Sequence, residues 1–201
     1  MIVVGLTGGI ATGKSIVLET AGEFEGVLII DADQLAWTIY ERGKPAYNEI
    51  IDQFGQEIID DERAIDRKML GSIVFSDHEK LEKLEKIVHP RVMDELRKIK
   101  RDKKGNNKLM LVEGARIVQS KYVDQSFFDF IILIQVDKWT QISRLKKRNG
   151  IDEREARRLI GIQNYSESIK NKADFIINSR GRIEDTKRRT RELFIRLLDD
   201  I

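Results

Sequence analysis

A glycine-rich stretch near the N-terminus has the residue types and spacing that suit phosphate binding. Residues 8–15 read GGIATGKS and fit the phosphate-loop pattern G-x-x-x-x-G-K-[ST] at every fixed position. The glycines allow a tight turn whose backbone N–H groups point at a phosphate, and the following helix adds its positive dipole end. Lys14 can reach the terminal phosphates, and the Ser15 hydroxyl can ligate Mg²⁺. The predicted nucleotide-binding residues are Gly8, Gly9, Ile10, Ala11, Thr12, Gly13, Lys14 and Ser15.

Acidic side chains follow two of the short apolar runs that are typical of buried strands. Asp31 and Asp33 come after the run 27–30, and Glu113 comes after the run 109–112. In an open parallel sheet, ligands bind outside the carboxyl ends of the strands. In extended geometry the two aspartates face one way, so that one can hold Mg²⁺ through water while the other takes a proton from an acceptor hydroxyl. The competing interpretations are a helix cap for each aspartate and a solvated carboxylate for Glu113.

A charged helical stretch from residue 138 to about 172, interrupted by Gly150, lies between two predicted strands. Spacings of three and four place Gln141, Arg144 and Arg148 on one face of this helix. Guanidinium groups delivered by a mobile lid would neutralise the charge that develops on a transferred phosphoryl group. An ordinary solvated helix face is the competing interpretation.

Composition narrows the class of protein. The 201 residues include 36 Lys and Arg against 34 Asp and Glu, two histidines and no cysteine. Disulfides and thiolate zinc sites are therefore excluded, and no apolar segment approaches the length of a membrane span. We interpret the basic run 97–108 as a solvated helix end and not as a nucleic-acid site. Because the chain starts directly in a predicted strand without a basic leader, we expect a cytoplasmic protein, with a monomer as the expected state.

Short apolar runs alternate with helical stretches along the chain, which is typical of a mainly parallel sheet flanked by helices. Five runs predict strands, at 2–6, 27–30, 109–112, 130–134 and 175–177. The first helix is expected to run to about Phe24, and an amphipathic helix from Ile183 is expected to close the chain. The sequence therefore predicts an α/β fold with a five-stranded, mainly parallel sheet.

The region between the second and third strands is helical and too long for an ordinary crossover, so we expect an inserted helical subdomain over 45–91. A long helix is predicted over 77–89, and another is predicted to begin after Pro90. His89 precedes that proline and is expected to be a structural hydrogen-bonding residue. Trp37, Tyr40 and Tyr47 could line an acceptor pocket, although such spacing is more often that of core residues.

In order and spacing, several segments closely resemble the dephospho-coenzyme A kinase family over nearly the whole chain. The phosphate loop is shared with many kinases, whereas LEKIVHP at 84–90 and ADFIIN at 173–178 are more particular to this family. The other matching segments are 31–33, 66–68 with Leu70, 74–75, Gln141 with Arg144 and Arg148, and Gln163.

The resemblance implies a three-layer P-loop kinase fold in three parts, a core (1–44, 92–138 and 173–201), a helical coenzyme A domain (45–91) and a lid (139–172). It also implies ATP- and Mg²⁺-dependent phosphorylation of the ribose 3′-hydroxyl of dephospho-coenzyme A, the last step of coenzyme A synthesis. By position, Asp33 is similar to the family's base and Arg144 to its lid arginine, with Lys14 as the third catalytic residue. The remaining implied roles are metal binding by Ser15 and Asp31, nucleotide binding by Ile16, Arg148 and Asn178, and acceptor binding by Asp33, Arg67, His89 and Glu113.

Two departures from the family pattern stand out. Ile16 replaces the Thr that commonly follows the phosphate-loop serine. After the third strand, the family's usual Asp-x-Pro-Leu-Leu-x-Glu is here EGARIVQ at 113–119, which alters one wall of the expected acceptor pocket. A kinase of the same architecture acting on a nucleoside, nucleotide or sugar is therefore an alternative. A nucleotide-dependent switch that transfers no phosphate is a second alternative.

Overall fold

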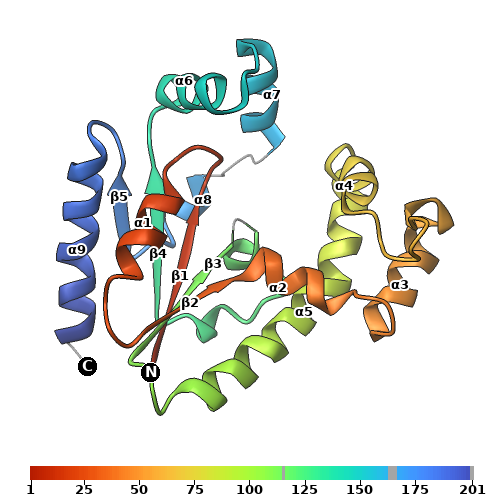
Figure 1. Cartoon of the computed structure of the whole chain (residues 1–201), viewed down its shortest axis with the longest axis horizontal. Helices are drawn as coiled ribbons and strands as arrows, with labels where there is room; N and C mark the ends of the chain where they lie inside the picture. Colours follow the sequence, from red (N-terminus) through yellow and green to blue (C-terminus); the bar gives the residue numbers. More distant parts are fainter. Residues whose placement is uncertain (115, 163–166, 200–201) are drawn as a thin grey trace.

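A five-stranded parallel sheet forms the centre of the computed structural model (Figure 1). The structure describes residues 1–114, 116–162 and 167–199, so Ala115 and Gln163 lie outside the described part. Within it the strands follow the spatial order β2-β3-β1-β4-β5, and each neighbouring pair is parallel. The strands are β1 (Ile2–Gly8), β2 (Val27–Asp31), β3 (Leu109–Glu113), β4 (Phe130–Gln135) and β5 (Phe175–Asn178). The predicted α/β class and all five predicted strands are confirmed.

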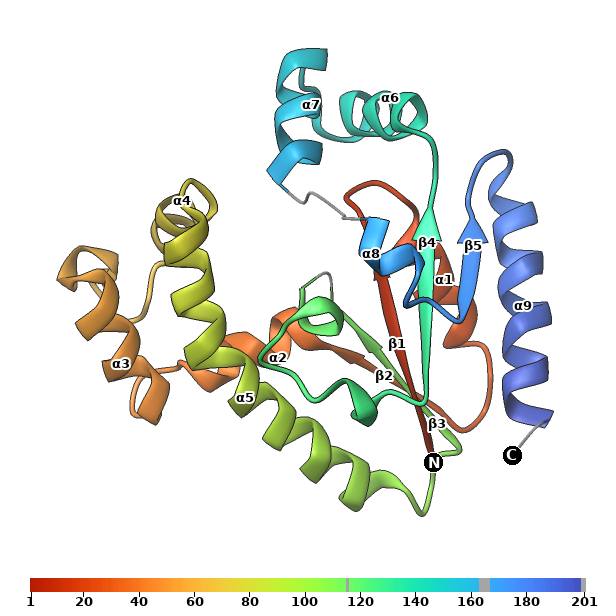
Figure 2. The same cartoon turned by 180° about the vertical axis from the view of Figure 1, so that it is seen from behind.

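Both faces of the sheet are covered by helices, which explains why its strands are almost continuously apolar. Val4 and Leu6 of β1 belong to the core shared with α1 (Lys14–Ala21) and α9 (Ile183–Asp199). Val3 points the other way, into the core shared with α2 (Ala32–Ile39) and α5 (His78–Lys103). The result is a three-layer arrangement, with α1 and α9 on one side of the sheet and α2 and α5 on the other (Figures 1 and 2).

The segment between β2 and β3 contains helices and no described strand, as expected. Its further elements are α3 (Pro45–Phe54), a 3₁₀ turn at Gln56–Ile58 and α4 (Arg67–Phe75). Asp66 and Asp77 accept backbone N–H groups at the starts of α4 and α5, so both helices have side-chain caps. The buried residues of these helices and one face of the sheet form a single continuous hydrophobic core. The inserted helices are therefore packed as an extension of the sheet.

Helix α5 corrects one prediction, because it is a single helix in which Pro90 is an interior residue. A proline at this position removes one backbone hydrogen bond and was expected to separate two helices. In the structure, Val88, Val92 and Met93 are buried on both sides of the proline, so tertiary packing holds the two halves in one continuous helix. The first helix is also shorter than predicted. It ends at Ala21, where the N–H of Gly22 closes the last turn by donating to the Leu18 carbonyl.

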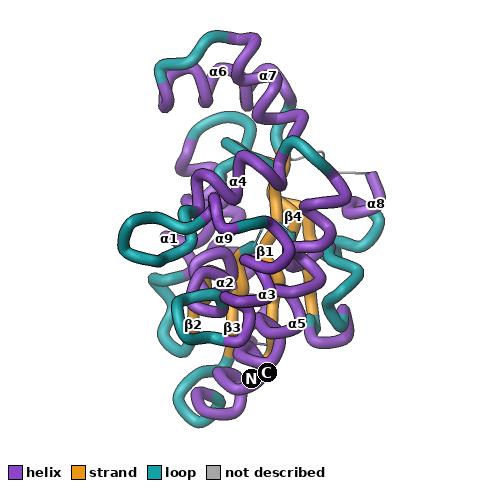
Figure 3. Tube along the Cα trace, turned by 90° about the vertical axis from the view of Figure 1, so that its right-hand side faces the viewer, coloured by secondary structure: helices purple, strands orange, loops and turns teal. Residues whose placement is uncertain are grey.

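The described residues between β4 and β5 form three helices, namely α6 (Lys138–Asn149), α7 (Glu153–Ile162) and α8 (Glu167–Lys170). Helices α6 and α7 project beyond the carboxyl end of the sheet (Figures 2 and 3). Gly150 ends α6 in a left-handed conformation, with φ 66°. Ile142, Leu145 and Ala156 form a small separate core, against which Ile10 and Ala11 of the glycine-rich loop pack. None of the described helices combines the length and apolar character needed to cross a membrane.

Phe194 and its neighbour Ile195 test the packing of α9 on the sheet. Phe194 is fully buried and stacks on Phe24 with ring centroids 5.9 Å apart, whereas Ile195 is 50 % exposed. We predict that Phe194→Ala lowers the free energy of unfolding by about 3–5 kcal/mol, because it leaves a large cavity. Ile195→Ala is expected to change it by about 0.5 kcal/mol or less. Urea unfolding measures both, and equal losses in the two variants would contradict this packing.

His89 lies in the middle of α5 and predicts a specific dependence of stability on pH. The residue is 9 % exposed, and its Nδ1 has no hydrogen-bond partner among the described residues. Burial, followed by the charge of Arg116, lowers the pKa of His89 from 6.5 to about 4. Between these two values the unfolded chain binds a proton that the folded chain does not bind, so stability falls as the pH is lowered through this window.

The test is to compare unfolding free energies at pH 7 and pH 4.5 in wild type and in His89→Gln. We expect His89→Gln to remove roughly 2–3 kcal/mol of the acid-induced loss. The exposed His78 is the only other histidine, and His78→Gln serves as the matched control. An acid-induced loss in His89→Gln as large as that of wild type would show that His89 does not cause it.

Candidate active site

The glycine-rich loop connects the end of β1 at Gly8 to the start of α1 at Lys14. A Cβ atom on Gly8 would lie 2.6 Å from the backbone oxygen of Ile134, so only glycine fits between β1 and β4 here. Gly13 caps α1 in a left-handed conformation, with φ 102°. These two positions explain the glycines of the motif: one allows close packing on the sheet and the other turns the chain into the helix.

Side chains from the loop itself and from helix α6 hold the loop in place. The Lys14 ammonium donates to the Gly8 carbonyl at 2.8 Å, and the Gln141 amide donates to the Ile10 carbonyl at the same distance. The Arg144 guanidinium donates to the carbonyl oxygens of Ala11, at 3.2 Å, and of Ser179, at 2.7 Å. The predicted face of α6 therefore contacts the phosphate loop.

A cavity of about 700 Å³ opens beside the loop. Its walls include loop and α1 residues together with Glu113 and basic residues of α6, namely Gly9, Ala11, Thr12, Gly13, Lys14, Ser15, Ile16, Arg144, Lys147 and Arg148. Its volume is within the range of small-molecule sites, and its lining is rich in groups that bind phosphate. Most of the predicted nucleotide-binding residues therefore share one cavity.

Three of the predicted nucleotide-binding residues are placed elsewhere. Gly8 ends β1 at the start of the loop, and Ile10 lines a neighbouring cavity of about 360 Å³ together with Lys138 and Gln141 of α6. Asn178 lies outside the lining of the large cavity, and its side-chain oxygen accepts the N–H of Arg180. The contact with the loop is made by the next residue, the buried Ser179, whose hydroxyl lies between the Thr12 carbonyl and Arg144.

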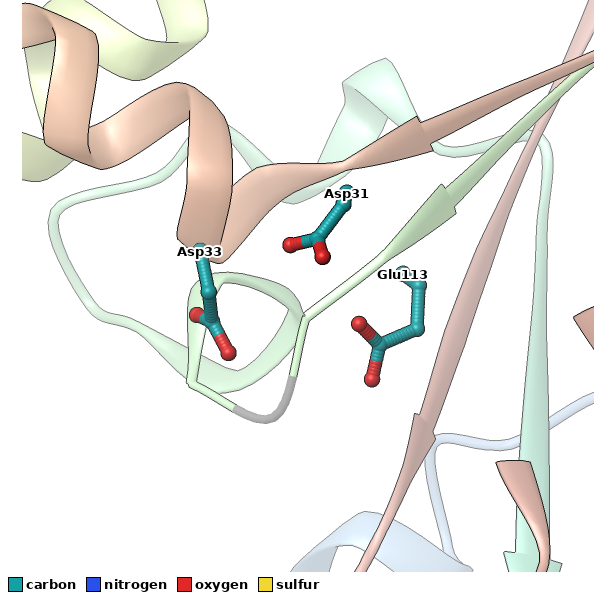
Figure 4. A group of neighbouring side chains, drawn as sticks. All are labelled: Asp31, Asp33 and Glu113. Atoms are coloured by element: carbon teal, nitrogen blue, oxygen red, sulfur yellow. The ribbon is translucent and has the colours of Figure 1, made fainter. Parts of the chain in front are cut away.

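Three carboxylates meet at the carboxyl edge of the sheet (Figure 4). One oxygen from each of Asp31, Asp33 and Glu113 lies within 4.8 Å of the others. The strand register explains this meeting, because Asp31 pairs with Glu113 across β2 and β3. The expectation that both aspartates are in extended chain is wrong for Asp33. That residue is in the first turn of α2, and Asp31 caps this helix by accepting the N–H of Gln34 at 2.9 Å.

Burial strongly affects the charged groups at this edge. The Lys14 ammonium lies 3.7 Å from a Glu113 carboxylate oxygen. Burial nevertheless lowers the pKa of Lys14 and raises the pKa of Glu113, so desolvation outweighs their mutual attraction. Desolvation in the cleft, and then the charge of Asp31, raises the pKa of Asp33. Lys14 would hold its charge more readily next to an anionic phosphate, and Asp33 and Glu113 would do so next to a cation.

A further cavity, of about 350 Å³, lies between α2, α4 and α5. Asp33, Arg67 and His89, three of the four predicted acceptor-binding residues, line it together. The fourth, Glu113, lines the larger cavity beside the loop. Asp33 and Glu113 thus connect the two cavities through the carboxylate cluster.

Aromatic side chains contribute to the wall of the smaller cavity. Trp37 and Tyr40 both line it, and the Arg67 guanidinium lies over the Trp37 ring, 4.2 Å from its centroid. Burial raises the pKa of Tyr40 to about 12. Tyr47, the third aromatic residue considered from sequence, instead donates its hydroxyl to the Arg63 carbonyl at 2.6 Å.

Four residues that sequence reasoning did not assign belong to this region. Ser179 bonds to the phosphate loop, Lys147 lines the loop cavity, and Arg116 and Glu85 line the smaller cavity. Lys147 lies between Arg144 and Arg148 in sequence, so the basic run already offered a signal for it. Contacts between distant segments define the other three positions, which no local pattern marks.

Comparison with known proteins agrees with this geometry. Residues 2–185 match the family model described as dephospho-CoA kinase. The chain is 41 % identical over 188 residues to a dephospho-CoA kinase of Bacillus cereus, covering 92 % of each chain. It is 37 % identical to one of Syntrophus aciditrophicus, covering 98 % of this chain and 84 % of the relative. A solved structure of dephospho-CoA kinase from Campylobacter jejuni has the same fold, with a TM-score of 0.68, 24 % identity and 98 % of each chain covered. The chain belongs to the dephospho-CoA kinase family, whose members phosphorylate dephospho-coenzyme A.

Proposed function

We propose that this chain transfers the γ-phosphate of ATP to the ribose 3′-hydroxyl of dephospho-coenzyme A, with ATP in the cavity beside the loop and the acceptor in the cavity between α2, α4 and α5. One observation carries this proposal. Asp33 lines the acceptor cavity, and its carboxylate lies within 4.8 Å of that of Glu113, which lines the nucleotide cavity. An acceptor hydroxyl beside Asp33 would therefore face the end of a triphosphate held by the loop.

The basic residues of the nucleotide cavity suit the charge of the transferred group. Phosphoryl transfer needs little covalent chemistry from a protein, so positioning and charge stabilisation account for most of the catalysis. Lys14 and the loop amides would hold the terminal phosphates, and Arg144 and Arg148 would neutralise charge from the side of α6. Arg144 already lines the cavity and contacts the loop, so a small movement of α6 would bring it to the γ-phosphate.

Asp33 suits the role of base toward the acceptor. Its carboxylate lines the acceptor cavity, where it can accept the proton of the 3′-hydroxyl as the oxygen attacks phosphorus. The new bond between the 3′-oxygen and the γ-phosphorus replaces the bond from that phosphorus to the bridging oxygen, which leaves with ADP. Asp31 caps α2 by accepting the Gln34 N–H, which fixes the start of the helix and thereby the place of Asp33.

The carboxylate cluster fits Mg²⁺, the usual companion of ATP. The three carboxylates have oxygens within 4.8 Å of one another, and Ser15 lines the same cavity as Glu113. Together they offer hard oxygen donors, which this cation prefers. Asp31 and Ser15 would hold it, with Glu113 close by. The cation would supply positive charge to the phosphate oxygens.

The three-part organisation also indicates which part of the chain would move when ligands bind. We assign residues 1–44, 92–138 and 173–201 to the core, residues 45–91 to acceptor binding and residues 139–172 to the lid. Helix α5 crosses the boundary between the acceptor-binding part and the core at residues 91 and 92. Because α5 is continuous and the insertion shares its core with the sheet, the acceptor-binding part would stay fixed to the core. The lid has a small core of its own and contacts the loop mainly through α6, so closure would involve the lid.

The direct test incubates the purified chain with γ-labelled ATP, Mg²⁺ and a panel of acceptors. The panel contains dephospho-coenzyme A, nucleosides, nucleotides and sugars. We expect efficient transfer to dephospho-coenzyme A alone, with ³¹P spectroscopy placing the new phosphate on the 3′-oxygen. Efficient turnover of another acceptor, with none of dephospho-coenzyme A, would overturn the proposal. ATP hydrolysis that depends on a protein partner, with no acceptor used, would indicate a switch protein.

Asp33→Asn tests the assigned base in the same assay. The variant keeps the size of the side chain and removes its ability to take a proton, so we predict that kcat falls by about 10²-fold or more. Calorimetric titration is expected to show unchanged ATP binding. Asp52→Asn, at an exposed position of α3, is the control. Turnover of Asp33→Asn equal to that of the control would remove Asp33 from the role of base.

A further inference from the structure

The segment that follows β3 departs most clearly from the family pattern, and the structure shows what has replaced it. Arg116 precedes a 3₁₀ turn, Ile117–Gln119, whose residues Ile117 and Val118 are buried in the core. Arg116 itself lines the acceptor cavity together with Asp33, Arg67 and His89. A cation therefore stands in the cavity wall at a place where the family pattern has an apolar side chain.

Two carboxylates of α5 hold this segment. The Arg116 Nε donates to the Glu85 carboxylate, and the side chains of Lys121 and Tyr122 donate to Glu82, three residues earlier on the helix. Within the first pair, the Glu85 side chain is 14 % exposed and the Arg116 side chain is 40 % exposed. Glu85 is thus the enclosed partner, and Arg116 is the partner that a ligand can reach.

The guanidinium has donors to offer besides the one that Glu85 engages. It carries five N–H groups in a planar fork, and the Nε group uses one of them. The two amino groups suit bidentate binding of phosphate oxygens, which is the geometry that distinguishes arginine from lysine. The other arginine of the cavity, Arg67, lies over Trp37, whereas the charge of Arg116 acts on both Asp33 and His89. Arg116 is therefore close to the place assigned to the acceptor ribose.

We propose that Arg116 binds the diphosphate of the acceptor, held in orientation by Glu85, and that this contact contributes to acceptor specificity in this chain. The inference rests on the proposed function and deepens it. In dephospho-coenzyme A, one ribose ring separates the 3′-hydroxyl from the 5′-diphosphate. A cation that shares a cavity with Asp33 is therefore placed to reach the diphosphate while the hydroxyl faces the base.

Steady-state kinetics of Arg116→Leu and Arg116→Lys test the proposal, with dephospho-coenzyme A and ATP varied separately. Loss of charge-assisted hydrogen bonds predicts that Arg116→Leu raises KM for dephospho-coenzyme A by about 10-fold or more, with KM for ATP unchanged. Arg116→Lys is expected to recover part of the loss. In wild type, KM for dephospho-coenzyme A should rise with added NaCl more steeply than in Arg116→Leu, because salt screens this contact.

Lys121→Leu is the matched control, because it removes one positive charge from the same segment and one ion pair to α5. It lies outside the lining of the acceptor cavity, so its KM values should match those of wild type. Glu85→Gln distinguishes phosphate binding by Arg116 from a purely structural role of its ion pair with α5. If Arg116 only ties the segment to α5, Glu85→Gln and Arg116→Leu should raise KM equally, whereas a phosphate contact predicts a clearly smaller effect of Glu85→Gln.

The outcomes distinguish failure of the proposed function from failure of the Arg116 inference. Wild type that does not use dephospho-coenzyme A overturns the proposed function, and the inference falls with it. Wild type that uses it, with Arg116→Leu within twofold of its KM or with the loss confined to kcat, overturns the inference alone. Equal effects of Glu85→Gln and Arg116→Leu also overturn it. If Arg116→Leu does not fold by circular dichroism, Arg116→Gln replaces it in the same comparisons.

Discussion

The site depends on bringing three carboxylates and one ammonium group together at the carboxyl edge of a parallel sheet. The register places Glu113 between Leu6 of β1 and Asp31 of β2, so strand pairing fixes this meeting point. Burial then lowers the pKa of Lys14 and raises the pKa of both Asp33 and Glu113, so it opposes the charged form of each group. A site of this kind is electrostatically incomplete by itself, and a metal–triphosphate complex supplies both the positive and the negative charge that it can accommodate.

The rest of the fold positions ligands around this edge. Helix α2 starts immediately after β2, so Asp31 caps the helix while Asp33 faces the acceptor cavity. Helix α5 runs from the inserted helices to the core without a break and carries both His89 and Glu85 into the cavity wall. On the opposite side, Gln141 and Arg144 of α6 bond to the backbone of the phosphate loop. The cavity beside the loop is thus contacted by α6, and the cavity between α2, α4 and α5 is built from packed helices.

Local patterns in the sequence predicted the parts that local chemistry determines. The phosphate loop, the five strands and the acidic residues at strand ends all follow from composition and spacing over a few residues. The errors at Pro90 and Asp33 have different physical origins, tertiary packing for Pro90 and helix capping for Asp33. Proline chemistry predicted a break at Pro90, whereas buried residues on both sides keep α5 intact. Extended geometry was predicted for Asp33, whereas the capping of α2 by Asp31 places it in a helix.

Some contacts that join distant segments were not predicted. Ser179 and the phosphate loop are separated by more than 160 residues, and Arg116 and Glu85 by 31. Nothing in the residues around Ser179 indicates that its hydroxyl will lie against Thr12. The sequence did show that the segment after β3 was unusual, but only the structure shows that its arginine enters the acceptor cavity.

The central claim is that the carboxylate edge binds the triphosphate by way of a cation. Calorimetric titration of ATP, with Mg²⁺ and with the metal chelated, tests this claim most directly in wild type and in Glu113→Gln. Without a cation, the carboxylates at this edge repel the triphosphate, so removing Mg²⁺ is predicted to weaken ATP binding to wild type by about 10-fold or more. Glu113→Gln removes one of these charges and is predicted to reduce the difference between ATP affinity with and without Mg²⁺. Equal affinity of wild type for ATP with and without Mg²⁺ would contradict the account.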